Sequence, residues 1–279
     1  MIKLSSILPS SCFGSIGTIT GMESVDKLDI LLGYNLPFIK SFEHVIISLN
    51  KGPNVSEDIV THYLDMWSVN VPNVVLLVSD TNRGHMFGTM DLEEDLLRYV
   101  KKNIPSAKYL FKSMDDVIIY DRLLEVEVPE ADFYYLPGFS YETVVIKSRS
   151  IEDLYNNYET YKSWYYTPQT TFFILNISNI ASLYGDDVGW KYDHYMAVKK
   201  LRPEIKPWEV AFYLKFDCES HLGRTTKDLS KYCLIEPEFK QLASLAQTLP
   251  ITDPSHKNIF FNRIGVCHYH FYNQNVISV

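Results

Sequence analysis

Three short apolar runs separated by two helical patterns constrain the fold of this chain most strongly. The first run, His44 to Leu49, is rich in β-branched residues, as is typical of a strand buried on both faces. Similar runs follow at Val74 to Val78 and at Lys108 to Lys112. The pattern predicts the order β-α-β-α-β between residues 45 and 112. Such an order gives a parallel sheet with right-handed crossovers and ligands at the carboxyl ends of its strands.

The segments between these runs carry helix start signals. Ser56 is a good N-cap for the first helix. The second helix is expected to begin at Asp91, because Asp91 and Glu94 have the spacing of a capping box. The first 44 residues give only a weak pattern, in which Asp26 to Ile39 reads as a helix-like stretch broken at Pro37.

The pattern changes after residue 130. Strands are expected at 132–136, 143–147 and 171–175, and a tyrosine-rich segment at 155–166 has helical spacing. No internal repeat or flexible linker interrupts the chain, so we expect residues 1–279 to form a single α/β domain.

Composition and charge exclude several classes of protein. The chain is 46% hydrophobic and 22% charged, which is typical of a globular protein. Its net charge of −8 and the lack of a basic run argue against tight nucleic-acid binding. No apolar run reaches the ~18–20 residues of a transmembrane segment, and the start does not resemble a signal peptide. The four cysteines form no C-x-x-C pair, so we expect a cytoplasmic protein.

Two polar segments follow predicted strands. The first is Asn82-Arg83-Gly84-His85, which precedes Gly88. Glycines let the backbone approach a ligand closely, the start of a helix offers free N–H groups, and an arginine can reach a phosphate. The simpler alternative is an ordinary turn.

The second polar segment ends in Asp115-Asp116, directly after a buried strand. Adjacent carboxylates repel one another and are costly to desolvate, so something usually compensates them. Mg²⁺ or Mn²⁺ that bridges to phosphate oxygens would do so. The alternative is a solvated turn with an aspartate that caps the next helix.

Together the two segments resemble the nucleotide-sugar half of GT-A fold glycosyltransferases, especially family 2. In that family an N-x-G motif opens the helix and a strand ends in D-x-D-D. The matching residues here are Asn82-Arg83-Gly84 and the run Tyr109 to Asp116, in which Ser113 replaces the first aspartate. The resemblance extends over residues 44–220. It implies a GT-A (Rossmann-like) fold with a nucleotide-sugar half at about 40–130, and an acceptor half with the C-terminal tail at about 131–279.

The resemblance also implies partners and a metal. It suggests a nucleotide-sugar donor lined by Asn82-Arg83-Gly84-His85 and Asp115, with Mn²⁺ or Mg²⁺ held by Asp115 and Asp116. Many enzymes of this fold use a late histidine as a further metal ligand, and His268 or His270 would serve. These two lie on the same side of an extended segment, although a core or surface role explains such a pair equally well. The aromatic segment 155–166 would stack on a sugar or pack in the core.

A catalytic base is expected in the acceptor half. One acidic pair, Asp186-Asp187, resembles the G-G-F-D-E turn of the family. We favour Asp217 and Glu219, because the apolar run Val210 to Phe216 would hold them rigidly at a strand end. Either carboxylate would take the proton of an acceptor hydroxyl in an inverting displacement. The alternative is a surface acidic pair.

Two other functions stay open at this point. A nucleotidyltransferase can share the sheet order and the acidic motif, but Leu49 to Pro53 lacks the Gly- and Arg-rich loop that such enzymes carry. A non-catalytic carbohydrate-binding protein of the same fold would explain Ser113. The sequence does not name the acceptor, which would be a glycan, a lipid, a protein or a modified nucleic acid.

Overall fold

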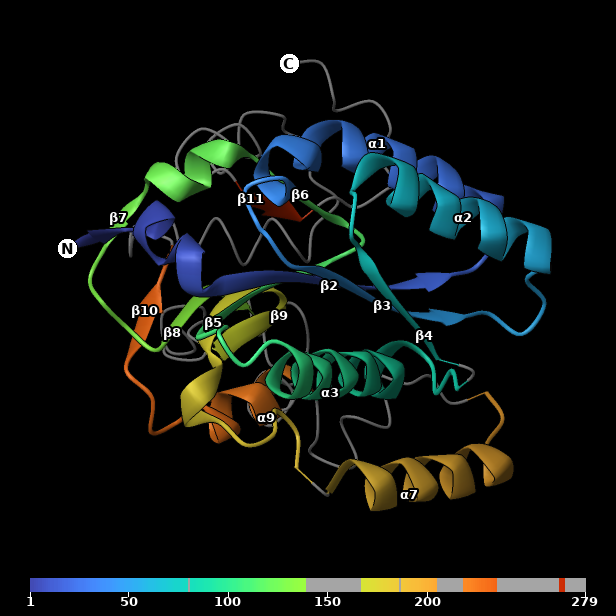
Figure 1. The fold of residues 1–279 in the computed structure, drawn as a ribbon. Coiled ribbons are helices and arrows are strands. Elements are labelled where there is room, and N and C mark those ends of the chain that lie inside the picture. Colours follow the sequence, from blue (N-terminus) through green and yellow to red (C-terminus); the bar gives the residue numbers. More distant parts are fainter. Residues whose placement is uncertain (80, 139–166, 186, 205–217, 235–265, 269–279) are drawn as a thin grey trace, which may run out of the picture.

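A seven-stranded sheet forms the centre of the computed structural model, in the order β10-β8-β9-β5-β2-β3-β4 (Figure 1). The structure describes residues 1–79, 81–138, 167–185, 187–204, 218–234 and 266–268. The strands are β1 (Ile2–Lys3), β2 (Ser11–Ile19), β3 (Val45–Lys51), β4 (Val75–Ser79), β5 (Tyr109–Met114), β6 (Val117–Ile119), β7 (Glu127–Val128), β8 (Phe133–Gly138), β9 (Thr167–Asn176), β10 (Lys231–Cys233) and β11 (Val266–His268). The α-helices are α1 (Met22–Ile39), α2 (Glu57–Asn70), α3 (His85–Asn103), α7 (Asp187–Leu201) and α9 (Cys218–Thr225); short 3-10 helices are η1 (Leu4–Ser10), η2 (Asp121–Glu125) and η4 (Ile177–Asn179).

The sheet is mostly parallel. β4, β3, β2 and β5 run parallel to one another, β9 is antiparallel to both β5 and β8, and β10 is parallel to β8. The expected α/β class and the element order from β3 to β5 are therefore confirmed. Strands expected at 132–136 and 171–175 correspond to β8 and β9. Residues 143–147 and the aromatic segment 155–166 lie outside the described residues.

In the first 44 residues, the helix-like stretch predicted at Asp26 to Ile39 corresponds to α1, but strand β2 was not predicted. β2 lies between β3 and β5 and is buried along almost its whole length. Its sequence, Ser11 to Ile19, is rich in serine and glycine, so it lacks the β-branched run that marks a buried strand. α1 also continues to Ile39, past the break expected at Pro37.

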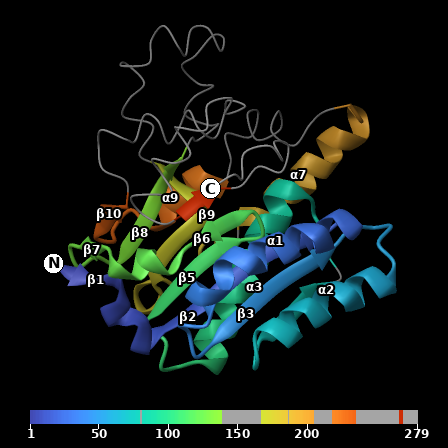
Figure 2. The same ribbon diagram turned by 90° about the horizontal axis from the view of Figure 1, so that it is seen from above.

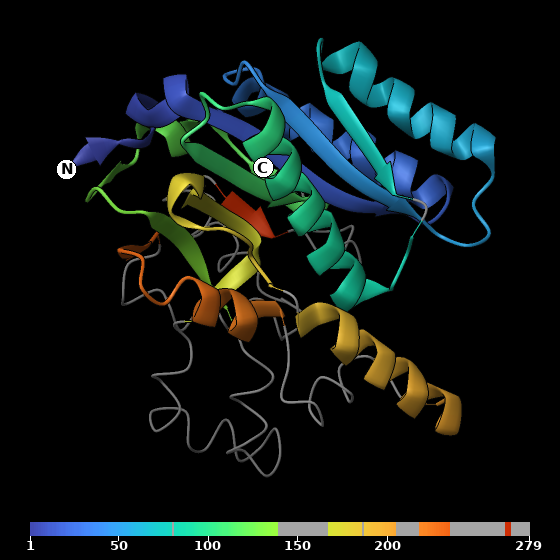
Figure 3. The same ribbon diagram turned by 60° about the horizontal axis from the view of Figure 1, so that its bottom comes forward.

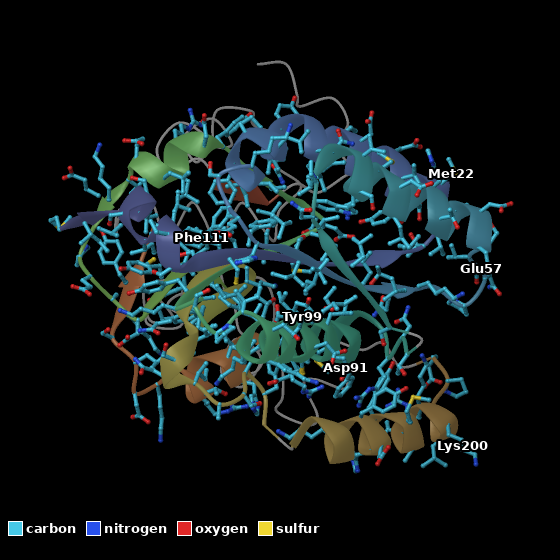
Figure 4. The ribbon with its side chains drawn as sticks, viewed as in Figure 1. Met22, Glu57, Asp91, Tyr99, Phe111 and Lys200 are labelled. Atoms are coloured by element: carbon cyan, nitrogen blue, oxygen red, sulfur yellow. The ribbon has the colours of Figure 1, made fainter. Side chains whose placement is uncertain are left out.

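Two layers of helices cover the sheet. α1 and α2 lie on one face, and α3 and α9 on the other (Figures 1 and 3). Figure 2 shows α1 running along β2 and β3. Alternation along β5 supplies both layers: Phe111, labelled in Figure 4, packs in the core on the α1–α2 side, and Leu110 packs in the core on the α3 side. Among the described residues, no helix has both the length and the apolar character needed to cross a membrane.

The start of α3 also differs from the expectation. The helix begins at His85, six residues before Asp91, and Gly84 precedes it with a φ of 83°. Glycine tolerates this left-handed backbone conformation, so the chain can turn directly from the loop into the helix. Asp91 therefore lies inside α3, and it forms an ion pair with Arg83 instead of capping the helix.

A buried ion pair joins α3 to the sheet. The ammonium of Lys112 on β5 contacts the carboxylate of Glu93 on α3, and neither side chain is exposed. Lys112 also donates to the Thr170 carbonyl of β9, and the Tyr184 hydroxyl donates to Glu93. Burial raises the pKa of Glu93, while Lys112 and Tyr184 oppose the increase. Since an uncompensated buried charge is costly, each partner depends on the other.

We expect Glu93→Gln to lower the free energy of unfolding by about 3–5 kcal/mol, because it leaves the Lys112 ammonium buried without a counter-ion. Urea denaturation followed by circular dichroism measures this. The matched control is Glu57→Gln, which removes an exposed partner of Lys51 and should cost at most about 1 kcal/mol. Equal losses in the two variants would contradict the role assigned to the buried pair.

Candidate functional site

The strand order reverses between β2 and β5. From β2 the chain passes through α1 to β3 on one side, whereas β5 is reached from α3 on the opposite face of the sheet. A doubly wound sheet opens a crevice at such a point, outside the carboxyl ends of the two strands. The predicted acidic pair follows β5 directly, so Asp115 and Asp116 lie at this switch point.

Asp115 packs closely against β2. A Cβ at Gly17 would lie 2.7 Å from Asp115 Oδ2, so only glycine leaves room for the carboxylate here. The Thr18 N–H donates to Oδ2 at 3.3 Å, and the Asp115 N–H donates to the Ile16 carbonyl. On the other side, Lys27 Nζ of α1 lies 3.4 Å from Oδ1. The switch point thus holds Asp115 in one defined position.

Burial and the neighbouring charges act in different directions on the pKa of the Asp115 carboxyl. Burial raises the pKa of the Asp115 carboxyl, the nearby Lys27 ammonium lowers it, and Asp116 raises it again. The direction that prevails is an increase. A carboxylate held in this state gains from any additional positive charge that enters the crevice.

The segment after the acidic pair is fixed on two sides. The side-chain amide of Asn35 in α1 donates to the Val117 carbonyl and accepts from the Ile119 N–H, both at 2.8 Å. β6 also pairs antiparallel with β11, in a register that sets His268 opposite Val117. This brings the backbone of a late histidine beside the residue that follows Asp116. Its role as a metal ligand stays a prediction.

The N-x-G loop is fastened to the carboxyl end of β3. Asn82 Nδ2 donates to the Lys51 carbonyl at 3.1 Å, and Asn82 Oδ1 accepts from the Gly84 N–H at 2.9 Å. A Cβ at Gly88 would lie 3.1 Å from the side-chain amide of the buried Asn50, so the first turn of α3 lies directly against the end of β3. Asn82 and the two glycines therefore set the position of the loop.

Arg83 makes two contacts within the protein. Its guanidinium pairs with Asp91 at 2.6 Å and lies 5.0 Å from the centre of the Tyr192 ring of α7. These contacts tie the loop to α7 and reduce the exposure of the Arg83 side chain to 26%. A contact between Arg83 and a phosphate, which the sequence suggested, stays a prediction. Arg83 would have to leave Asp91 to make it.

The structure brings the two predicted motifs to one edge of the sheet. Thr18 contacts Asp115, and Thr18 is also the register partner of Asn50, which lies beside the N-x-G loop. Only the ends of β2 and β3 therefore separate the acidic pair from the loop. Figure 4 shows Met22 and Glu57, the first residues of α1 and α2, at the same side of the molecule.

Other predicted site residues are placed only partly. Glu219 belongs to α9, which packs on the α3 side of the sheet, and Asp187 is the first residue of α7. Asp186, Asp217 and His270 lie outside the described residues, and the side chain of His85 is not described. The assignment of the catalytic base therefore stays a prediction.

A hollow of about 330 Å³ lies on the α3 side of the loop. It is lined by Ser79, Thr81, Arg83, Met90, Asp91, Glu94, Asp95, Arg98, Gly185 and Gly189. The lining carries three carboxylates and two guanidiniums, and both arginines already form ion pairs, Arg83 with Asp91 and Arg98 with Asp95.

Asp115 and Asp116 fit a divalent cation that is shared with phosphates. Mg²⁺ commonly takes one or two carboxylates, and substrate phosphates and water complete its coordination. Within the described part of the chain, no group of three or more histidine, cysteine, aspartate or glutamate side chains could hold a metal. A cation held by Asp115 and Asp116 therefore stays a prediction.

Sequence reasoning missed two residues of the site, Gly17 and Lys27. A signal for Gly17 existed, since a glycine inside a strand often marks a close approach of another group. Nothing in the sequence indicated that Lys27 belongs to the site, because a lysine in a helix normally lies in solvent.

Among the solved structures similar to this chain are three glycosyltransferases, the class that the sequence motifs resemble. The apo bifunctional glycosyltransferase WbbM is 15% identical (TM-score 0.37), over 74% of this chain and 37% of that chain. The galactosyltransferase LgtC, in complex with donor and acceptor sugar analogs, is 10% identical (TM-score 0.44), over 92% and 86%. The apo glycosyltransferase GlyE of Streptococcus pneumoniae TIGR4 is 11% identical (TM-score 0.38), over 96% and 57%.

This chain thus spans well under half of WbbM and little more than half of GlyE. No protein-family model and no curated protein matches the sequence. At these identities and TM-scores the comparisons assign no reaction to this chain, so residue roles depend on its own geometry.

We expect Gly17→Ala to weaken the binding of Mn²⁺ with inorganic pyrophosphate by roughly 10- to 100-fold, because the added methyl group displaces Asp115. Titration calorimetry measures the affinity, and circular dichroism verifies the fold. The matched control is Gly33→Ala, since a Cβ at the exposed Gly33 of α1 meets nothing within 4 Å. Wild-type affinity in Gly17→Ala would show that Asp115 is not part of the binding site.

Proposed function

We propose that this protein is a glycosyltransferase that moves a sugar from a nucleotide-sugar donor to a hydroxyl acceptor, assisted by a divalent cation and with inversion. The observation that carries the proposal is the position of Asp115-Asp116 at the switch point between β2 and β5, with the N-x-G loop at the same edge of the sheet. A doubly wound sheet binds nucleotides at this place.

We assign the following roles to the described residues. Asn82 and Gly84 shape the loop beside the nucleotide, and Asp115 and Asp116 would hold the cation. When bound, Mn²⁺ or Mg²⁺ would neutralise negative charge on the diphosphate leaving group. His268 is the candidate for a further ligand, supported by its register opposite Val117.

The acceptor side is proposed from the sequence alone. Asp217 or Glu219 would remove the proton of the acceptor hydroxyl, which requires a carboxylate within hydrogen-bond reach of it. The acceptor class, whether glycan, lipid, protein or modified nucleic acid, is not specified by the described residues.

Product analysis distinguishes this proposal from the other two functions. The purified protein is incubated with Mn²⁺ and a panel of nucleotide sugars, and nucleoside diphosphate is quantified. Diphosphate release supports transfer. Pyrophosphate release from a nucleoside triphosphate would instead identify a nucleotidyltransferase, and no turnover of either substrate would support a non-catalytic binding protein.

We expect Asp116→Asn and Asp115→Asn each to reduce diphosphate release by about 10²-fold or more, because both remove negative charge that the cation requires. The unfolding midpoint should change little. The matched control is Asp65→Asn, which alters an exposed carboxylate of α2 and should keep wild-type turnover. Near wild-type activity of both site variants would contradict the assignment.

Ligand binding should also stabilise the fold. Mn²⁺ added with a nucleoside diphosphate is expected to raise the melting temperature by several degrees at millimolar ligand, because ligands that bind only the native state stabilise it by mass action. Differential scanning fluorimetry measures the shift. A shift of the same size in Asp116→Asn would place the ligand elsewhere.

A further inference from the structure

Lys27 is a lysine built into the candidate site. It lies in the second turn of α1, between the buried residues Val25 and Leu28, which pack in the core and fix the helix on the sheet. Its side chain is 23% exposed and that of Asp115 is 16% exposed, and their charged atoms are 3.4 Å apart. The packing of α1 therefore fixes the backbone of Lys27 beside Asp115, and the side chain reaches the carboxylate from there.

Both oxygens of Asp115 have protein partners. Oδ1 contacts Lys27 and Oδ2 accepts from the Thr18 N–H. Gly17 closes the third side, since even a Cβ there would collide with the carboxylate. A divalent cation that approaches Asp115 must therefore share Oδ1 with Lys27 or displace it.

Because Lys27 lies beside the two carboxylates, the net negative charge at the site is small. Among the residues that the structure describes, the charged side chains that act on Asp115 are Lys27 and Asp116. One ammonium against two carboxylates leaves a net charge of about −1, whereas a hydrophobic residue at position 27 would leave about −2. A dication is attracted less strongly to the first arrangement than to the second, and a diphosphate is repelled less.

We propose that Lys27 is the resident cation of the Asp115-Asp116 pair, and that its ammonium contacts the donor diphosphate as well. This inference rests on the proposed function for the identity of the donor. Lys27 then competes with the divalent cation for Asp115 when no donor is present. With a donor bound, the ammonium turns to the phosphates, and the freed carboxylate holds the cation.

The two roles predict opposite effects of a single substitution. Lys27→Met should bind Mn²⁺ alone more tightly than the wild type, because the competing ammonium is gone. The same variant should bind inorganic pyrophosphate more weakly in the presence of EDTA, because a charge-assisted contact is lost. Lys27→Arg keeps the charge and should resemble the wild type in both measurements.

The experiment uses the full chain and two probes. Mn²⁺ binding is measured by electron paramagnetic resonance, and pyrophosphate binding in EDTA by titration calorimetry. We expect Lys27→Met to gain about fivefold or more for Mn²⁺ and to lose about tenfold for pyrophosphate. A tenfold loss corresponds to about 1.4 kcal/mol. The matched control is Lys3→Met. It removes the same charge from Lys3 of β1, whose ion pair with Glu125 is exposed, and should change neither affinity.

Unchanged Mn²⁺ affinity in Lys27→Met would overturn the competition, and unchanged pyrophosphate affinity would overturn the phosphate contact. The absence of Mn²⁺ binding to both the wild type and Lys27→Met would overturn the site itself. Neither probe requires turnover, so failure here differs from failure of the proposed function. If the protein turns over a donor but Lys27→Met changes neither affinity, the proposed function stands and the role of Lys27 is wrong. If both affinities change as expected but no donor is turned over, the role of Lys27 stands and the proposed function is wrong.

Discussion

The close approach of other groups to β2 is the constraint on which the rest of this structure depends. β2 lies between β5 and β3 in the parallel part of the sheet, and it has glycines on both faces. A Cβ at Gly14 would collide with Leu96 of α3, and one at Gly17 would collide with Asp115. One glycine therefore lets a helix pack closely against the sheet. The other leaves space for a carboxylate where the strand order reverses.

Two ion pairs lie on opposite sides of the sheet, one formed by a residue of β5 and one by the residue directly after it. Lys112 faces α3 and is neutralised by Glu93 in the core, whereas Asp115 lies over Gly17 of β2 and pairs with Lys27 of α1. The first pair is fully buried and holds the layers together. The second is partly exposed and lies directly after the end of the strand. The two pairs thus differ in burial, and only the partly exposed one belongs to the site that we propose for the donor.

The sequence allowed β3, β4 and β5 to be predicted, because each is an apolar run bounded by turn residues. It also located Asp115-Asp116 and the N-x-G loop, since polar residues directly after a buried strand are conspicuous. β2 was missed because its packing requires small residues, which reduce strand propensity. The start of α3 was misplaced because the helix begins at His85, directly after Gly84, and not at Asp91.

The sequence by itself determined the α/β class and which residue types end each strand, because these follow from local periodicity. Only the tertiary structure decided which groups meet. Asp115 lies over Gly17 and beside Lys27 because β2 is placed between β3 and β5. Lys27 and Asp115 are 88 positions apart in the sequence. Likewise, the pairing of β11 with β6 set His268 opposite Val117. Such contacts depend on strand order and helix packing, which no local pattern of residues encodes.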